Sequence, residues 1–382
     1  MINDNVPTVP AEFLLPREPL RFAAKDLDSL LEHCTKLKAS DITLQSAEPV
    51  VAEVFGRLYK ISKHKLSTAE VGDMLNAIYG PNGTTQILSG RDVDTHYEFR
   101  TMRVERYRYR VNATGCYVEG QHGIQLTIRT IPSDPPKLAS LNLQKEIVDA
   151  IAPREGVVYV TGATGSGKTT LLASIIRDIA EDPNCNRKIL TYEAPIEFVF
   201  DEIVKPTAIV SQSEIPRHLP TFADGVRNAL RRKPRLILVG EARDPETIAA
   251  VIEAALTGHP VYTTLHTTGV PETIRRLVGS FPADERIGRT IDIIETLRLI
   301  IWQKLVPTVD GKQVALREYL VFNEEVRDRL LESDPNQVTA VTRDLLNERG
   351  QSMVKDARKK FEEGIIPERE LKVILAGQKD RE

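Results

Sequence analysis

The sequence predicts an α/β protein: a core built on an open parallel sheet, preceded by a smaller α+β domain. Three observations lead to this expectation. After residue 144, short apolar runs alternate with helical stretches, which is typical of a parallel sheet with crossover helices. Before residue 132, strands and amphipathic helices follow in a less regular order. Between the two parts, residues 132–136 contain three prolines, which stiffen a connector but cannot join a core.

The composition is that of a globular protein able to bury two cores. The chain has 382 residues, 41% hydrophobic and 27% charged, with a formal net charge of −3. This acidic balance argues against a generally basic nucleic-acid-binding surface. Three widely spaced cysteines indicate reduced thiols in a cytoplasm, and neither a disulfide framework nor a metal site. No apolar run reaches the ~20 residues that cross a bilayer. Residues 1–20 lack the regions of a signal peptide, so we expect a cytoplasmic protein that reaches a membrane through partners.

The first part of the chain divides into an arm and a domain. Four prolines in residues 1–20 predict an extended arm. Residues 21–131 should form the α+β domain, with helices at 26–37 and 67–78, the second capped by Ser67 or Thr68, and strands at 40–45, 50–61 and 125–131.

One strand of this domain carries alternating arginines, in residues 106–111. Because strand side chains alternate between two faces, one set should meet the core and the other should not. The expected core set is Tyr107, Tyr109 and Val111, and the opposite set includes Arg108 and Arg110, with Arg129 on the strand at 125–131. Two interpretations stay open for these arginines: a solvated or salt-bridged sheet face, or arginines presented to a phosphate.

A phosphate-binding loop follows the first apolar run of the second part. Residues 162–169 fit the pattern G-x-x-x-x-G-K-[ST], between an apolar run at 157–160 and a helical stretch at 170–180. Glycines let backbone N–H groups approach phosphate oxygens, and the helix directs the positive end of its dipole there. Lys168 should neutralise the β- and γ-phosphates of ATP, and the Thr169 hydroxyl should bind Mg²⁺. The expected nucleotide-binding residues of the loop are Gly162, Ala163, Thr164, Gly165, Ser166, Gly167, Lys168, Thr169 and Thr170.

Three further strands should end beside this loop. The apolar runs at 189–192, 236–239 and 261–265 lead into Glu193, Glu241 and His266. Because ligands of an open parallel sheet lie at the carboxyl ends of its strands, these side chains should converge on one nucleotide.

The remaining boundaries follow from composition and helix signals. We expect a proline-rich linker at 132–143, the nucleotide-binding domain at 144–322 and a charged helical region at 323–382. Within the domain, helices are expected at 146–152, at 222–232 and from Asp244 to Gly258, with Asp244 as the cap. The pattern is helical from 271 to 305 and strand-like from 314 to 322.

With these residues in view, the chain resembles the secretion ATPases of the PilT/GspE superfamily, the hexameric motors of type II and type IV secretion and of type IV pili. The resemblance runs from residue 40 to residue 322. Four segments carry it: 191–197 resembles the family's Asp box, 236–244 its Walker B strand and 257–267 its His box, while 108–112 with Arg129 matches its N-domain arginine positions. The wording of residues 193–198 is similar to the type IVB secretion and conjugation branch. Two departures stand out: Ala194 replaces a usual aspartate, and residues 233–235 are basic where acids are common.

The resemblance implies a RecA-like ATPase core, a PAS-like N-terminal domain and a role for each polar residue of the site. Glu241 would orient or deprotonate the attacking water, and Lys168 with Mg²⁺ would supply charge. Glu193 and Glu197 would hold Mg²⁺ through water. The residues expected closest to the metal are Thr169, Glu193 and Glu241. His259 and His266 would sense the γ-phosphate, and Arg108, Arg110 and Arg129 would reach a nucleotide between subunits or across the linker.

Less specific interpretations of the same residues stay open. Glu241 could be a carboxylate that only caps the end of a strand. Glu193 and Glu197 could form structural ion pairs with Arg227 or Arg231. A lone histidine is usually an ordinary polar residue. A zinc site is disfavoured because no cysteine lies near these positions.

Three classes of function follow from the sequence. The first is a cytoplasmic, homohexameric ATPase that powers export or assembly in a type IVB secretion or conjugation system and meets the inner membrane through partners of that apparatus; a type IV pilus retraction motor would share its active site. The second is a nucleic-acid translocase, which the acidic charge and the absence of basic tracts disfavour, so no direct specific nucleic-acid binding is expected. The third is a nucleotide-binding scaffold without catalysis.

Overall fold

The computed structural model describes residues 13–101, 105–131 and 134–379. The chain splits into two compact units, Met1–Ser133 and Asp134–Glu382, which are described separately below. Most of the predicted arm, residues 1–12, and the first two residues of the predicted linker lie outside the described residues.

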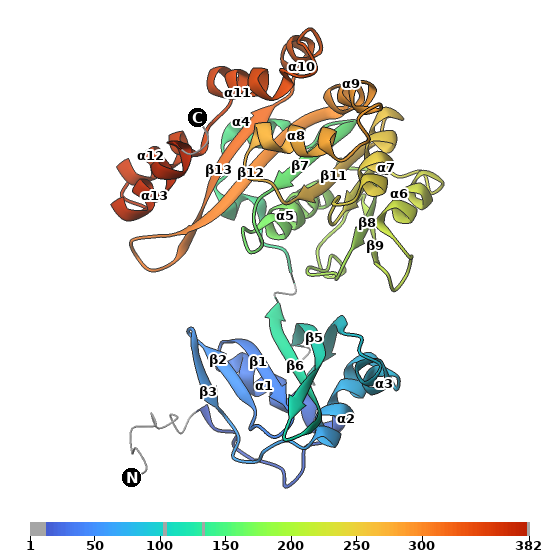
Figure 1. The fold of residues 1–382 in the computed structure, drawn as a ribbon, viewed down its shortest axis with the longest axis vertical. Coiled ribbons are helices and arrows are strands. Elements are labelled where there is room, and N and C mark those ends of the chain that lie inside the picture. The colour runs from blue at the N-terminus through green and yellow to red at the C-terminus, as the bar shows by residue number, and fades with distance from the viewer. Residues whose placement is uncertain (1–12, 102–104, 132–133, 380–382) are drawn as a thin grey trace. The chain divides into compact units, whose positions relative to one another are not determined.

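The first unit is an antiparallel sheet with helices on one face (Figure 1). Its strand order is β3-β2-β1-β6-β5-β4. The strands are β1 (Ala39–Gln45), β2 (Val51–Val54), β3 (Arg57–Lys60), β4 (Val93–Arg100), β5 (Arg106–Val118) and β6 (Gln121–Ile131). The helices are η2 (Ala24–Asp26), α1 (Leu27–Lys36), α2 (Thr68–Tyr79) and α3 (Gly83–Leu88). The expected helices and strands of this part are present, but β4 and α3 were not foreseen.

The alternation in β5 separates the core from an arginine-bearing face, as the sequence predicts. Tyr109 and Val111 are fully buried, and Tyr107 packs against the same core. The Tyr109 hydroxyl also donates a hydrogen bond to the Leu31 carbonyl, at 3.1 Å, which ties β5 to α1. Because the apolar core lies on one face only, it fixes the register of this strand.

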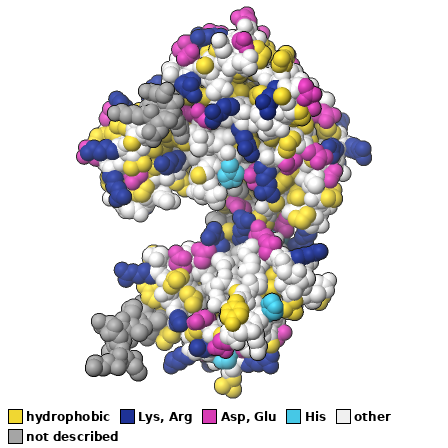
Figure 2. Space-filling model, in the orientation of Figure 1, with side chains coloured by type: hydrophobic (Ala, Val, Ile, Leu, Met, Phe, Trp, Pro, Cys, Tyr) yellow, Lys and Arg dark blue, Asp and Glu magenta, His cyan; other side chains and the backbone are white. Residues whose placement is uncertain are grey.

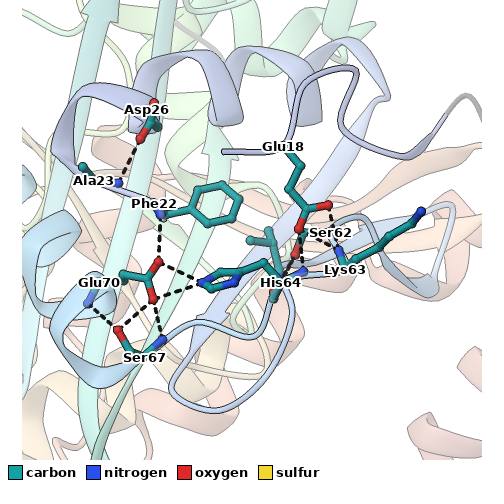
Figure 3. Close-up of polar contacts among 10 residues, drawn as sticks. Glu18, Phe22, Ala23, Asp26, Ser62, Lys63, His64, Ser67 and Glu70 are labelled. Carbon is teal, nitrogen blue, oxygen red and sulfur yellow. Dashed lines mark hydrogen bonds and ion pairs between the residues drawn. The ribbon is translucent and has the colours of Figure 1, made fainter. Parts of the chain in front are cut away.

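The start of the described chain is fastened to α2 through Glu70 (Figure 3). The Glu70 carboxylate is buried and accepts hydrogen bonds from the Phe22 N–H, the Ser67 N–H and His64 Nε2, at 2.7, 2.7 and 2.9 Å. Ser67 caps the helix in return by accepting from the Glu70 N–H. Burial raises the pKa of Glu70, but the hydrogen bonds from Ser67, Phe22 and His64 outweigh it and hold the pKa below the ordinary value of 4.5.

The second unit is built on a seven-stranded sheet with the order β13-β12-β7-β11-β10-β8-β9. All neighbouring pairs are parallel except β12 and β13. The strands are β7 (Gly156–Thr161), β8 (Lys188–Glu193), β9 (Ile209–Glu214), β10 (Leu236–Val239), β11 (Pro260–Leu265), β12 (Leu297–Pro307) and β13 (Gln313–Val321). The carboxyl ends of β7, β8, β10 and β11 therefore meet at one edge of the sheet, as ligand sites of open parallel sheets require.

Helices cover both faces of this sheet, so successive residues of its central strand enter different cores. On β7, Val157 and Tyr159 join one core, while Val158 and Val160 join the other. The first core is closed by α6 (Phe222–Leu230), α7 (Pro245–Leu256), α8 (Val270–Gly279), α9 (Arg286–Thr296), α10 (Glu324–Leu331) and α11 (Val338–Arg349). The second is closed by η3 (Leu138–Leu141), α4 (Lys145–Ala150) and α5 (Lys168–Glu181).

The expectation of continuous helix from 271 to 305 is wrong beyond residue 296. The structure has α8 and α9 there and then β12, which runs between β7 and β13. Residues 299–302 are buried on both faces of the sheet. An apolar run buried on two sides has no periodicity, so length and pattern alone do not separate it from a buried helix. Strand β9, which is short and largely polar, was not foreseen either.

The last helices pack on the far end of the β12–β13 hairpin. Trp302, Val306 and Leu316 of the hairpin form a small core with residues of α12 (Met353–Glu362) and α13 (Glu368–Lys379). The helical character expected for 323–382 is thus observed in its described part, which ends with α13 at Lys379. Over the described residues, the helices fall short of the length and apolarity that a membrane crossing needs.

Candidate active site

The loop between β7 and α5 is shaped by glycines at positions where a side chain does not fit. Gly162, Gly165 and Gly167 have φ angles of 144°, 76° and 82°, in the region that favours glycine. A Cβ on Gly162 would also collide with the Gln303 carbonyl oxygen and lie 2.6 Å from Ser166 Oγ. The loop therefore packs tightly against β12, and its backbone stays accessible on the side where α5 begins.

Lys168, the first residue of α5, is buried and turned into the loop. Its ammonium donates hydrogen bonds to the carbonyls of Gly162 and Ala163, at 2.9 and 2.8 Å. Burial lowers the pKa of Lys168, while the nearby carboxylates of Glu241 and Glu197 act in the opposite direction. The Lys168 side chain is thus held by two loop carbonyls at the place where phosphates would sit, with the carboxylates of Glu241 and Glu197 nearby.

The loop fits a magnesium–nucleotide complex. Ser166 Oγ is buried and has no hydrogen-bond partner. Thr169 and Thr170 are partly exposed in the first turn of α5, whose free N–H groups and dipole favour an anion. Over the described residues, no group of three His, Cys, Asp or Glu side chains is placed to hold a metal ion. Mg²⁺ commonly uses one or two protein oxygens together with phosphate and water, and the Thr169 hydroxyl could supply such an oxygen.

Glu193 ends β8 and is held rigidly at the sheet edge. It is buried, and Oε1 accepts hydrogen bonds from Thr191 Oγ1 at 2.6 Å and from Gln212 Nε2 at 3.1 Å. Gln212 lies on β9, the strand that the sequence analysis did not foresee. Its support of Glu193 was therefore missed as well, and a polar residue in a short strand gave no signal for it.

Glu241 and His266 meet at the same edge. His266 directly follows β11, Glu241 follows β10 after Gly240, and His266 Nε2 lies 3.5 Å from Glu241 Oε1. Backbone hydrogen bonds join the loops around them: Ala242 N–H donates to the Thr264 carbonyl, and Gly162 N–H to the Leu265 carbonyl. The structure thus brings Lys168, Glu193, Glu241 and His266 to one edge of one sheet.

These features are those of a phosphate-handling site on a parallel sheet, and comparison with known proteins gives its family. A family model described as "Type II/IV secretion system protein" matches residues 101–365. The chain belongs to this family.

Individual relatives agree with this assignment. The crystal structure of the Legionella pneumophila ATPase DotB superposes with a TM-score of 0.90, at 67% identity over 95% of this chain and 99% of that one. A crystal structure of the pilus retraction motor PilT with bound ADP gives a TM-score of 0.77 at 30% identity, covering 90% and 95%. The type IV pilus retraction ATPase PilT of Pseudomonas aeruginosa is 33% identical over 313 residues, 82% of this chain and 87% of PilT. The chain is an ATPase of the PilT/GspE superfamily, and its second unit has the RecA-like fold.

His259 does not lie with the other predicted site residues of this ATPase. Its carbonyl accepts a hydrogen bond from the N–H of Gly156, the first residue of β7, whereas the phosphate loop follows the last residue. Its ring Nδ1 lies 3.1 Å from the Ala254 carbonyl at the end of α7. The expected contact of His259 with a nucleotide of its own chain therefore finds no support, because the six residues of β11 separate it from the catalytic edge.

The arginines of the first unit are paired with acids across the sheet. Arg108 binds Glu98, Arg110 binds Asp94 and Arg129 binds Asp41, with the closest N···O distances at 3.1, 2.9 and 2.9 Å. Their exposure differs widely: the side chains of Arg108, Arg110 and Arg129 are 2%, 39% and 63% exposed. The salt-bridged sheet face is thus real, and Arg129 is the most accessible of the three to an outside anion.

An arginine-lined pocket and Gln303, both near the site, were not singled out from sequence. A pocket of about 480 Å³ opens beside His266, and its lining includes Arg243, Arg275 and Arg276, which make that side of the site positive. Arg227, which was a possible partner for Glu193 and Glu197, instead pairs with Glu246 at 2.8 Å. Gln303 of β12 contacts the phosphate loop itself and is discussed below.

Proposed function

We propose that the chain is a homohexameric, Mg²⁺-dependent ATPase that powers export or assembly in a type IVB secretion or conjugation apparatus. The observation that supports this most is the likeness to the ATPase DotB at 67% identity over 95% of the chain. It spans both units and the whole catalytic edge. In this proposal the protein acts in the cytoplasm and meets the inner membrane through components of the apparatus.

The mechanism assigns one task to each group at the sheet edge. Lys168 exchanges its two loop carbonyls for oxygens of the β- and γ-phosphates when ATP binds. Glu241 orients the attacking water and accepts its proton, and His266, 3.5 Å away, reports whether the γ-phosphate is present. Mg²⁺ would neutralise phosphate charge, held by the Thr169 hydroxyl and, through water, by Glu193 and Glu197.

Hydrolysis becomes movement if the first unit contacts the nucleotide only in some states. Arg110 and Arg129 are the better candidates for that contact, because Arg108 is almost fully buried. Such an arginine would have to leave or share its carboxylate, and an arginine finger is worth about 10³–10⁵ in rate. We expect Arg129→Ala to lower the ATPase rate of assembled rings without weakening nucleotide binding to the second unit. Unchanged rate and assembly in both Arg129→Ala and Arg110→Ala would exclude this role.

The catalytic part of the proposal is tested with Glu241→Gln. This variant should bind ATP with wild-type affinity and hydrolyse it at least ~10²-fold more slowly, because a general base typically contributes 10²–10⁴. A scaffold without catalysis would be unaffected by the change. The matched control is Glu246→Gln, a carboxylate on the nearby helix α7 that pairs with Arg227, which should leave the rate unchanged.

The biological part is tested by what the ATP-bound Glu241→Gln ring retains from membranes. Recovery of components of a secretion or conjugation channel supports the proposal, whereas recovery of pilus platform components would favour the retraction motor. The likeness to PilT, at 30% identity over 90% of the chain, supports the retraction motor as the second candidate function.

A nucleic-acid translocase is the rival of another class. On the face drawn in Figure 2, Lys and Arg side chains are interspersed with Asp and Glu over both units. With a net charge of −3, this mixture gives little basis for counterion-driven binding to nucleic acid. ATPase activity that DNA or RNA stimulates, and that salt then steeply reduces, would overturn our proposal in favour of this rival.

A further inference from the structure

Gln303, near the middle of β12, holds the backbone of the phosphate loop. Its Nε2 donates a hydrogen bond of 2.7 Å to the Ser166 carbonyl, and its side chain is 3% exposed. Ser166 is separated from Lys168 only by Gly167, so this contact fixes the turn that delivers the lysine. The bond joins residues 137 positions apart in the chain.

The side chain of Gln303 can do this only if its amide is held in one orientation. The Nε2 end must face the Ser166 carbonyl, so the Oε1 end needs a donor of its own. Arg317 Nε supplies it at 3.0 Å from the neighbouring strand β13. Without Arg317, Oε1 would be a buried acceptor with no partner, and a flipped amide would set two oxygens against each other.

Arg317 is itself fixed from two further directions. Its Nη2 donates to the Leu141 carbonyl at 3.1 Å, at the end of η3, and its backbone N–H donates to Asp356 Oδ2 of α12 at 2.8 Å. Arg317 and Asp356 are 3% and 1% exposed, and Lys360 Nζ lies 2.7 Å from Asp356 Oδ1. Burial lowers the pKa of Arg317 to about 10, and Asp356 opposes this shift, so the guanidinium stays charged at neutral pH.

We propose that Arg317 is a positioning residue for the nucleotide: it orients Gln303, which holds the phosphate loop in its binding shape, and it makes helix α12 part of the loop's support. The described hydrogen bonds of Gln303, Arg317 and Asp356 include none to the side chains of Lys168, Glu193, Glu241 or His266. It gives the C-terminal helical region a role in the ATPase cycle that the sequence alone did not suggest.

The next residue of β13 extends the same arrangement. Glu318 is buried and accepts from the N–H of Val270 at 2.8 Å, at the start of α8, and from the N–H of Met353 at 3.3 Å, at the start of α12. Arg317 binds α12 through its backbone N–H and points its side chain to Gln303, whereas the Glu318 carboxylate itself bonds to α12, so the two residues connect α12 to two different parts of the site. One is the phosphate loop and the other is the helix that follows His266.

The test compares Gln303→Leu, Arg317→Met and the double variant in the full-length protein. Each single change should raise the dissociation constant for ADP and for ATP about tenfold, or ~1.4 kcal/mol, because nucleotide binding must then order the loop. The rate at saturating ATP should stay within about threefold of wild type, since bound nucleotide restores the loop's shape. The double variant should also bind nucleotide about tenfold, and not a hundredfold, more weakly than wild type. Both changes break the same connection, in which Arg317 orients Gln303 and Gln303 holds the phosphate loop.

Two controls separate this role from general stability. Arg329→Met removes an exposed pair with Glu348 in the same region and should leave the dissociation constants unchanged. Leu346→Ala, in the core under α11, should lower the melting temperature without changing nucleotide affinity. Asp356→Ala should weaken ADP binding in wild type and have no further effect in Gln303→Leu.

Additive losses in the double variant would overturn the proposal, as would wild-type affinity in Gln303→Leu. Equal loss of affinity in Leu346→Ala at a matched melting temperature would also overturn it, because the effect would then be one of stability. If Arg317→Met does not fold, the pair Gln303→Leu and Asp356→Ala gives the same decision.

Discussion

Gly162 and Gly165 offer a test of the loop geometry within four residues of sequence. Both have positive φ, which disfavours an alanine. At Gly165 an added Cβ meets nothing within 4 Å, so Gly165→Ala costs only the backbone strain. At Gly162 the Cβ would strike the Gln303 carbonyl oxygen, which belongs to β12 and cannot retreat without moving a strand that is paired on both sides, with β7 and β13.

The expected magnitudes differ accordingly. Gly165→Ala should lose about 1–2 kcal/mol of loop stability, seen as a five- to thirtyfold weaker nucleotide affinity. Gly162→Ala should add ~2 kcal/mol or more to that strain, which brings the loss to several hundredfold and abolishes measurable turnover. Titration with a fluorescent ADP analogue measures both, and thermal melting reports whether the second unit is folded. Equal affinities in the two variants, or tighter binding by Gly162→Ala, would refute the close approach of the loop to β12.

Three further predictions concern the supports of the two units. Glu70→Gln should lower the melting temperature of the first unit at pH 7, and the difference from wild type should shrink as the pH falls below about 4.5. The reason is that the pKa of Glu70 is lower in the folded than in the unfolded protein, so the carboxylate stabilises the fold above its unfolded pKa and this stabilisation is lost as the pH falls through its folded pKa. Thermal melts at pH 7 and pH 4 check this. Asp244→Ala removes the cap that accepts from the Thr247 N–H at 2.8 Å and should cost ~1 kcal/mol, measured by urea unfolding, with Asp244→Ser restoring most of it. Tyr109→Phe should also cost ~1 kcal/mol by urea unfolding, because the buried hydroxyl is lost from its hydrogen bonds with the Leu31 carbonyl and Thr35 Oγ1, at 3.1 and 2.7 Å, and no loss would mean that water replaces the hydroxyl.

Local residue chemistry was enough to predict a large part of this fold. The caps at Ser67 and Asp244 were foreseen because a cap depends on side chains within one helical turn. The alternation in β5 was foreseen because every second residue of a strand lies on the same face, so each face can be identified from the sequence. The phosphate loop needs only a strand, a helix and glycines in one short stretch.

The sequence was a poorer guide where the decisive neighbours are distant in sequence. Residues 297–305 became a strand because β7 and β13 flank them, and nothing in the run itself excluded a helix. His259 was grouped with His266 because both lie in one motif, yet they sit at opposite ends of β11. Sequence spacing alone did not say which edge of the sheet each would occupy.

The amino-acid sequence by itself was enough to predict that this protein binds a nucleoside triphosphate, since the loop 162–169, between a strand and a helix, is a local pattern typical of phosphate binding. Only the tertiary structure decided how that loop is held. Gln303, Arg317 and Asp356 are ordinary residues in their own segments, and they acquire a role because folding removes them from water next to one another. A buried polar group must find a partner wherever the fold provides one, and that partner need not be near in the chain.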